Sequence, residues 1–75
     1  MTPARCMEVY RRVWDDVAPL DSDRGRAIVA EMVGVATADT LDAAVAVVAW
    51  WWGGEPTADD RRRVARARRM LRGEQ

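Results

Sequence analysis

The chain has 75 residues, a length that corresponds to one domain and buries only about 60% of its unfolded surface. It holds one cysteine and no histidine, which excludes a disulfide framework and a Cys/His metal cluster. The net charge is zero and all twelve basic residues are arginine, so catalysis by lysine is excluded as well. Stability must therefore come from good packing or from self-association.

Residues 3–17 are predicted to form the first helix. Thr2 is a good N-cap, and the proline after it suits the first helical position. Apolar side chains recur every three or four positions from Cys6 to Val17, which is the spacing of an amphipathic helix. Cys6 is interpreted as a small buried residue rather than a reactive thiol. Pro19 ends the helix, because the residue before a proline avoids the helical conformation.

The second predicted helix covers residues 23–36, with Asp21 or Ser22 as its N-cap. Two glycines interrupt it, Gly25 and Gly34, and each costs about 1 kcal/mol relative to alanine. They indicate either close packing against another backbone or a helix of low stability, and the second interpretation is favoured. The apolar stripe of this helix contains Ile28, Met32 and Val35.

The run from Leu41 to Trp52 is the one stretch long and apolar enough to form a central core helix. It predicts a third helix over residues 40–52, because it is longer than a usual strand and alanine recurs in it. Gly53 or Gly54 can adopt the left-handed conformation that closes a helix.

Three consecutive tryptophans end this helix. Three successive positions span roughly 200° of a helix, so these side chains cannot share one face. Trp51 and Trp52 are expected to be buried, whereas Trp50 lies on the small and polar side and is the best candidate for contact with a partner. Aromatic residues are enriched at interface centres, so the predicted protein interface comprises Trp50, Trp51 and Trp52. The alternative is that all three pack into a small core from different sides.

The fourth predicted helix covers residues 58–72 and has the clearest start signal in the chain. Thr57 and Asp60 resemble a capping box in which aspartate replaces the usual glutamate. Val64, Ala67 and Leu71 form a narrow apolar stripe, and Gly73 closes the helix.

No strand pattern is present, so the predicted fold class is all-α. We expect a small bundle of about four short helices in a single domain covering residues 1–75. The links of roughly three to five residues favour antiparallel neighbours.

The charges divide along the chain. Residues 57–75 hold seven arginines and three acidic residues, whereas residues 1–56 hold five arginines and nine acidic residues. An arginine-rich helix can grip the phosphates of nucleic acid or an acidic protein partner. The residues assigned to this role are Arg61, Arg62, Arg66, Arg69 and Arg72. Against it, the domain is not basic overall and has no RNA-stacking motif, and the arginines can simply pair with acids of the same chain.

The sequence shows no constellation for catalysis. Three pairs of neighbouring carboxylates occur, but adjacent positions on a helix do not face each other and helix caps explain two of the pairs. No carboxylate is expected in a sheltered cleft with a shifted pKa. The prediction is therefore not an enzyme, with no catalytic, cofactor-binding or metal-binding residue and no small-molecule substrate.

Location and function follow from these patterns. Residues 1–20 contain charged side chains and no apolar signal region, which predicts a cytoplasmic protein. A membrane span over residues 33–52 would place Asp39 and Asp42 inside the bilayer, at a free-energy cost of roughly 2.5–3.5 kcal/mol for each aspartate. A membrane span is therefore not expected. We therefore expect a small interaction protein, of adaptor or inhibitor type, that binds a protein partner or a copy of itself through the tryptophans. The alternative is a nucleic-acid-binding protein that uses the arginine-rich last helix.

Overall fold

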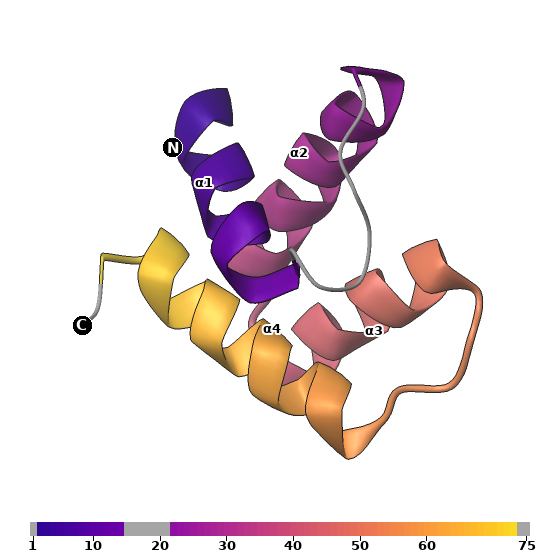
Figure 1. Ribbon diagram of the computed structural model, residues 1–75. Coiled ribbons are helices and arrows are strands. Elements are labelled where there is room, and N and C mark those ends of the chain that lie inside the picture. The colour runs from indigo at the N-terminus through magenta and orange to yellow at the C-terminus, as the bar shows by residue number, and fades with distance from the viewer. Residues whose placement is uncertain (1, 15–21, 74–75) are drawn as a thin grey trace.

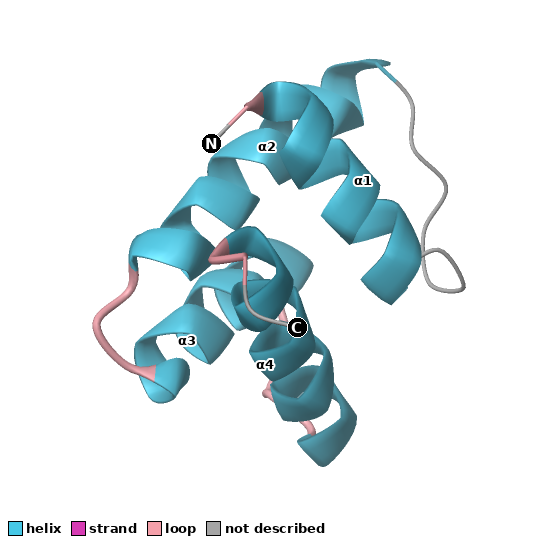
Figure 2. Ribbon diagram, turned by 90° about the vertical axis from the view of Figure 1, so that its left-hand side faces the viewer, coloured by secondary structure: helices cyan, strands magenta, loops and turns pink. Residues whose placement is uncertain are grey.

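Four helices form the described part of the chain, in the order α1 (Pro3–Trp14), α2 (Ser22–Thr37), α3 (Leu41–Trp52) and α4 (Ala58–Leu71). The computed structural model of the protein describes residues 2–14 and 22–73. No strand occurs within these two ranges, as Figure 2 shows, and the predicted all-α bundle is confirmed. The antiparallel orientation of successive helices stays a prediction.

Three sequence predictions fall outside the described residues. These are the end of the first helix at Val17, its termination by Pro19, and the N-cap of the second helix at Asp21 or through the side chain of Ser22.

Local hydrogen bonds explain where the helices begin and end. The Thr2 hydroxyl accepts a hydrogen bond from the backbone N–H of Arg5 at 3.2 Å, which confirms the predicted cap of α1. Thr40 caps α3 in the same way by accepting from the backbone N–H of Ala43 at 3.1 Å. Gly53 closes α3 in the left-handed region at φ 71°, a conformation that residues other than glycine rarely adopt.

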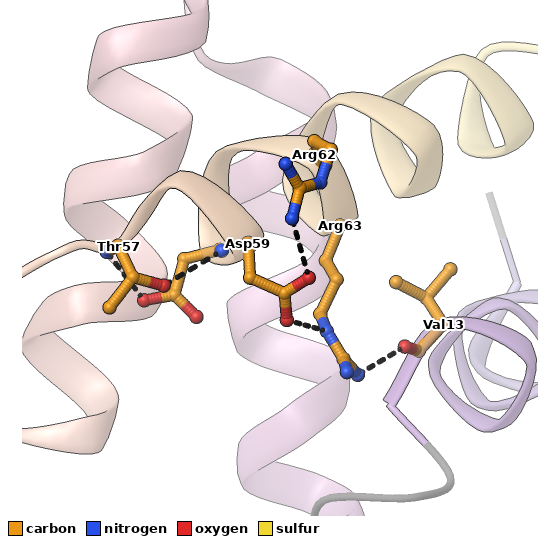
Figure 3. Close-up of polar contacts among 6 residues, drawn as sticks. Val13, Thr57, Asp59, Arg62 and Arg63 are labelled. Carbon is orange, nitrogen blue, oxygen red and sulfur yellow. Dashed lines mark hydrogen bonds and ion pairs between the residues drawn. The ribbon is translucent and has the colours of Figure 1, made fainter.

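The capping box at the start of α4 is confirmed. The backbone N–H of Thr57 donates to Asp60 Oδ2 at 2.9 Å, and the backbone N–H of Asp60 donates to Thr57 Oγ1 at 3.1 Å. Figure 3 draws the hydrogen bonds of Thr57 as dashed lines at the start of the helix. Aspartate is thus long enough to complete the box in place of glutamate.

The helices pack so that each touches its neighbours in the chain and the last touches the first. Both α1 and α3 contact α2 and α4 (Figure 1). The helices α2 and α4 also contact each other. The radius of gyration is 11.1 Å. A folded chain of this length is expected to have a value of about 11 Å, so the packing is as tight as in ordinary domains.

The core is built from the apolar stripes that the sequence predicts. Trp14 and Tyr10 stack on each other in α1, with ring centroids 5.6 Å apart. Cys6 is buried among them, and burial raises the pKa of its thiol, which agrees with its interpretation as a structural residue. The other fully buried large side chains are Val9, Ile28, Met32, Val35, Val45, Val48 and Val64.

The two glycines of α2 lie where neighbouring helices approach closely. A Cβ atom on Gly25 would lie 3.3 Å from Met7 Cε, and one on Gly34 would lie 3.3 Å from Val47 Cγ1. Close packing, the interpretation that the sequence ranks second, therefore describes these positions. The neighbours differ from the expectation, because they are side chains of α1 and α3 rather than backbone.

Candidate interaction surfaces

The three tryptophans of α3 occupy different environments. Trp50 is 81% exposed, which makes it the most exposed large apolar side chain in the described part of the chain. Trp51 and Trp52 are half-buried, so neither is enclosed as fully as the sequence suggests. The structure therefore places Trp50 on the surface, where the helical geometry predicts it, with Trp51 beside it.

A pocket of about 230 Å³ lies between α2 and α3 at the base of these tryptophans. Its walls are apolar except for one carboxylate, and we call it the tryptophan pocket. It is lined by Ala27, Ala30 and Glu31 of α2 and by Val47, Trp50 and Trp51 of α3. The small alanines leave room that larger residues would fill.

Glu31 is the polar residue of this pocket, and its side chain is buried with 6% exposure. Neither carboxylate oxygen has a hydrogen-bond partner within residues 2–14 and 22–73. Burial raises the pKa of Glu31 to about 7, and the positive charge of Arg24 limits the rise. The sequence indicates no sheltered carboxylate with a shifted pKa, and Glu31 corrects that expectation.

A pattern in the sequence does identify Glu31. It follows Ile28 by three positions and precedes Val35 by four, so it falls on the buried stripe of α2. A carboxylate inside an apolar stripe is the informative case, because ionised residues are almost never fully buried without a partner.

Arg24 connects Glu31 with the tryptophans. Its guanidinium lies over the ring of Trp52, 5.2 Å from the centroid, in a cation–π contact between α2 and α3. The pKa of the Tyr10 hydroxyl of α1 depends on the same two charged residues. Burial raises this pKa, the positive charge of Arg24 lowers it, and the negative charge of Glu31 raises it. A second hollow of about 530 Å³, which shares Ala27 and Trp51 with the tryptophan pocket, includes Arg24 in its lining. The two hollows thus adjoin at Ala27 and Trp51, and together their linings contain charged groups of both signs.

Three of the five arginines assigned to a nucleic-acid or acidic partner make contacts within the chain. Arg61 pairs with Asp42 of α3 at 2.6 Å, and Arg62 pairs with Asp59 at 3.3 Å. Arg72 donates to main-chain carbonyls at the end of α2. The structure shows Arg66 and Arg69 exposed, and the described residues provide no ion pair or hydrogen bond to either.

Two further arginines of α4, outside the predicted set, also bind main-chain carbonyls. Arg63 donates from Nη1 to the carbonyl of Val13 at 2.8 Å and from Nε to Asp59 at 2.8 Å (Figure 3). Arg68 donates to the carbonyl of Ala38. Hydrogen bonds from Arg63 and then Arg62 hold the pKa of Asp59 below its usual value. Much of the positive charge of α4 is therefore used to hold the bundle together.

A shallow hollow of about 350 Å³ lies between α1 and α4 and is lined mainly by arginines. Its lining consists of Arg12, Val13, Arg62, Arg63 and Arg66. Arg62 and Arg63 share Asp59 as an acidic partner, and Arg12 lies 4.0 Å from Glu8. The hollow therefore combines Arg66, which has no acidic partner among the described residues, with arginines whose charge is offset by Asp59 or Glu8.

Comparisons of the chain with protein-family models, with curated proteins and with solved structures gave no match. Within the described residues, none of the helices has the length and apolar character needed to cross a membrane.

Proposed function

We propose that this chain is a non-enzymatic interaction protein that binds a protein partner, or a second copy of itself, through the tryptophan surface formed by Trp50, Trp51 and the pocket between α2 and α3. The observation that carries the proposal is the 81% exposure of Trp50 beside an apolar pocket. Tryptophan is enriched among the few residues that contribute most of the binding energy at protein interfaces. It makes this contribution when a partner covers its side chain. Trp50 supplies a side chain that a partner can cover, and the pocket beside it supplies a concave surface that a partner side chain can fill.

The pocket is better suited to binding than to catalysis. Its single titratable group is Glu31, and the other lining residues are alanine, valine and tryptophan. Acid–base chemistry requires a second group that donates, accepts or attacks in reach of the first. The lining supplies apolar area and one charge, which are the components of recognition.

Site-specific photo-crosslinking tests the proposal. A benzophenone amino acid in place of Ala46, an exposed residue one turn before Trp50, leaves every tryptophan intact. We expect it to crosslink in the expressing cells to a discrete protein, or to a second copy at twice the chain mass. Trp50→Ala in the same background should abolish that product. A product that persists unchanged in Trp50→Ala contradicts the proposal.

The nucleic-acid alternative rests on Arg66 and Arg69, which are exposed, and on the basic hollow beside Arg66. Fluorescence anisotropy with labelled duplex DNA and a structured RNA, at low and near-physiological salt, decides between the two functions. The proposed function predicts no binding at either salt concentration. Binding that weakens steeply with salt and is lost in the double variant Arg66→Ala, Arg69→Ala would assign the function to α4 instead.

A further inference from the structure

The tryptophan pocket combines two kinds of surface that seldom occur together. Its walls are apolar, yet Glu31 is one of the lining residues, and both of its carboxylate oxygens are buried without a hydrogen bond from the described residues. A buried acceptor without a partner loses its hydration and gains nothing in exchange. An occupant that fits this pocket needs an apolar stem for the walls and a hydrogen-bond donor for the carboxylate.

Charge defines the occupant further. Arg24 of α2 is the charged group that acts on Glu31, and Glu31 in turn raises the pKa of Tyr10 of α1. The residues of α3 that line the pocket are Val47, Trp50 and Trp51. The guanidinium of Arg24 lies over Trp52. It hydrogen-bonds neither Glu31 oxygen. The carboxylate therefore has unused acceptors, and the pocket that Glu31 lines is the route by which a second cation would approach it.

We propose that the tryptophan pocket receives a basic side chain, lysine or arginine, of a protein partner, with its methylene stem against Trp50 and Trp51 and its charged end on Glu31. Lysine and arginine side chains join a long apolar stem to a cationic head that carries only donors. A tryptophan face also attracts a cation, so the walls favour the same occupant as the carboxylate. This inference rests on the proposed function and specifies the chemistry of the partner.

Other occupants satisfy fewer of these groups. An apolar side chain of a partner would cover the tryptophans and leave Glu31 unpaired, at the free-energy cost of a buried carboxylate. A second copy of this chain can insert only arginine, because the sequence contains no lysine. A preference for lysine would therefore exclude self-association through this pocket, whereas a preference for arginine is compatible with either partner.

An NMR titration tests the pocket without any partner protein. The ligands are the N-acetyl N-methylamides of lysine, arginine and norleucine, the last being a neutral side chain of similar length. The signals are the indole N–H groups of Trp50 and Trp51 and the side-chain carboxyl carbon of Glu31. At pH 8 we expect saturable shifts with the lysine or arginine compound. The norleucine compound should bind at least tenfold more weakly.

The pH dependence gives a second readout. The cation binds the ionised carboxylate, so affinity must rise as pH increases through the pKa of about 7. Between pH 6 and pH 8 the ionised fraction of such a group rises roughly tenfold, and the affinity for the basic compounds should rise by the same factor. The affinity for the norleucine compound should not increase.

Glu31→Gln keeps the side-chain shape and removes the charge. In this variant we expect the preference for basic over neutral compounds and the pH dependence to disappear, whereas Glu55→Gln on the exposed link should change neither. Equal binding of norleucine and lysine compounds by the unaltered chain, or binding of basic compounds that Glu31→Gln leaves unchanged, overturns the inference. If Ala46 crosslinks depend on Trp50 while no basic compound binds, the proposed function stands and this inference falls.

Discussion

Arg72 donates two hydrogen bonds, from Nε at 3.2 Å and from Nη2 at 3.1 Å, to the main-chain carbonyl of Ala36. Ala36 belongs to the last turn of α2, where carbonyls have no partner inside the helix. Arg5 adds a charged donor at the end of α4, since its Nη2 donates at 2.9 Å to the carbonyl of Met70, which also accepts from the backbone N–H of Gly73. Guanidinium groups thus satisfy the carbonyl ends of two helices and place positive charge at the negative ends of their dipoles.

We predict that Arg72→Ala lowers the free energy of unfolding by about 1 kcal/mol, because it leaves helix-end carbonyls without their charged donor. Arg69→Ala, one turn away and exposed, should change it by less than about 0.5 kcal/mol. Arg72→Lys should recover only part of the loss, since an ammonium group lacks the planar fork. Urea denaturation followed by circular dichroism measures all three, and equal losses in Arg72→Ala and Arg69→Ala would contradict the capping role.

Glu31 should make stability depend on pH. Its pKa rises on folding from 4.5 to about 7, so the folded state binds the proton more tightly than the unfolded state. Ionisation therefore disfavours folding: stability is highest below pH 4.5 and falls as pH rises towards 7. The shift corresponds to a loss on the order of 2–3 kcal/mol from this group.

The matching variant is Glu31→Gln, whose side chain cannot ionise. At pH 8 we expect it to be more stable than the unaltered chain, and its free energy of unfolding should vary less between pH 5 and pH 8. Urea denaturation at several pH values provides the comparison, with Glu55→Gln as the control for loss of a carboxylate. A pH profile that is the same with and without Glu31 would show that this carboxylate does not titrate abnormally.

The two glycines of α2 should respond differently to alanine. Gly25→Ala gains up to about 1 kcal/mol from helix propensity, and the Met7 terminus that it meets is flexible enough to move. Gly34→Ala meets Val47, whose β-branched side chain is held in one rotamer in a helix. We therefore expect Gly25→Ala to raise the melting temperature and Gly34→Ala to lower it. Thermal unfolding tests this, and equal stabilisation by both would show that α3 yields at Val47.

Trp50 should contribute little to the fold despite its size. Its side chain is 81% exposed, so Trp50→Ala should change the free energy of unfolding by less than about 0.5 kcal/mol. Trp14→Ala removes a side chain that is 2% exposed and should cost about 3–5 kcal/mol. Chemical denaturation of both variants checks the contrast. A large loss in Trp50→Ala would mean that binding defects of that variant report unfolding.

The predictable part of the structure is the local part. Thr57 and Asp60 lie three positions apart, so their capping box depends on neither the other helices nor the rest of the chain. The buried stripe of Ile28, Met32 and Val35 follows likewise from the helical period. The surface position of Trp50 is also local, because three adjacent residues cannot face one core.

The remaining features depend on how helices meet. The partner of Arg72 is a carbonyl 36 positions earlier, and main-chain carbonyls carry no residue-type signal in a sequence. Glu31 belongs to a pocket only because α3 lies across α2, although its place on an apolar stripe marks it for attention. Gly34 is explained by Val47, which only the packed structure brings near.

The hydrogen bonds from Arg5 to Met70 and from Arg63 to Val13 join residues 65 and 50 positions apart. Contacts over such separations carry an entropic cost of loop closure, so we expect them to form late in folding. We call these two hydrogen bonds between α1 and α4 the α1–α4 seam, and this seam should form after the transition state. Arg63→Ala should then accelerate unfolding in stopped-flow experiments and leave the refolding rate nearly unchanged, so that this seam sets the lifetime of the native state rather than the speed of reaching it.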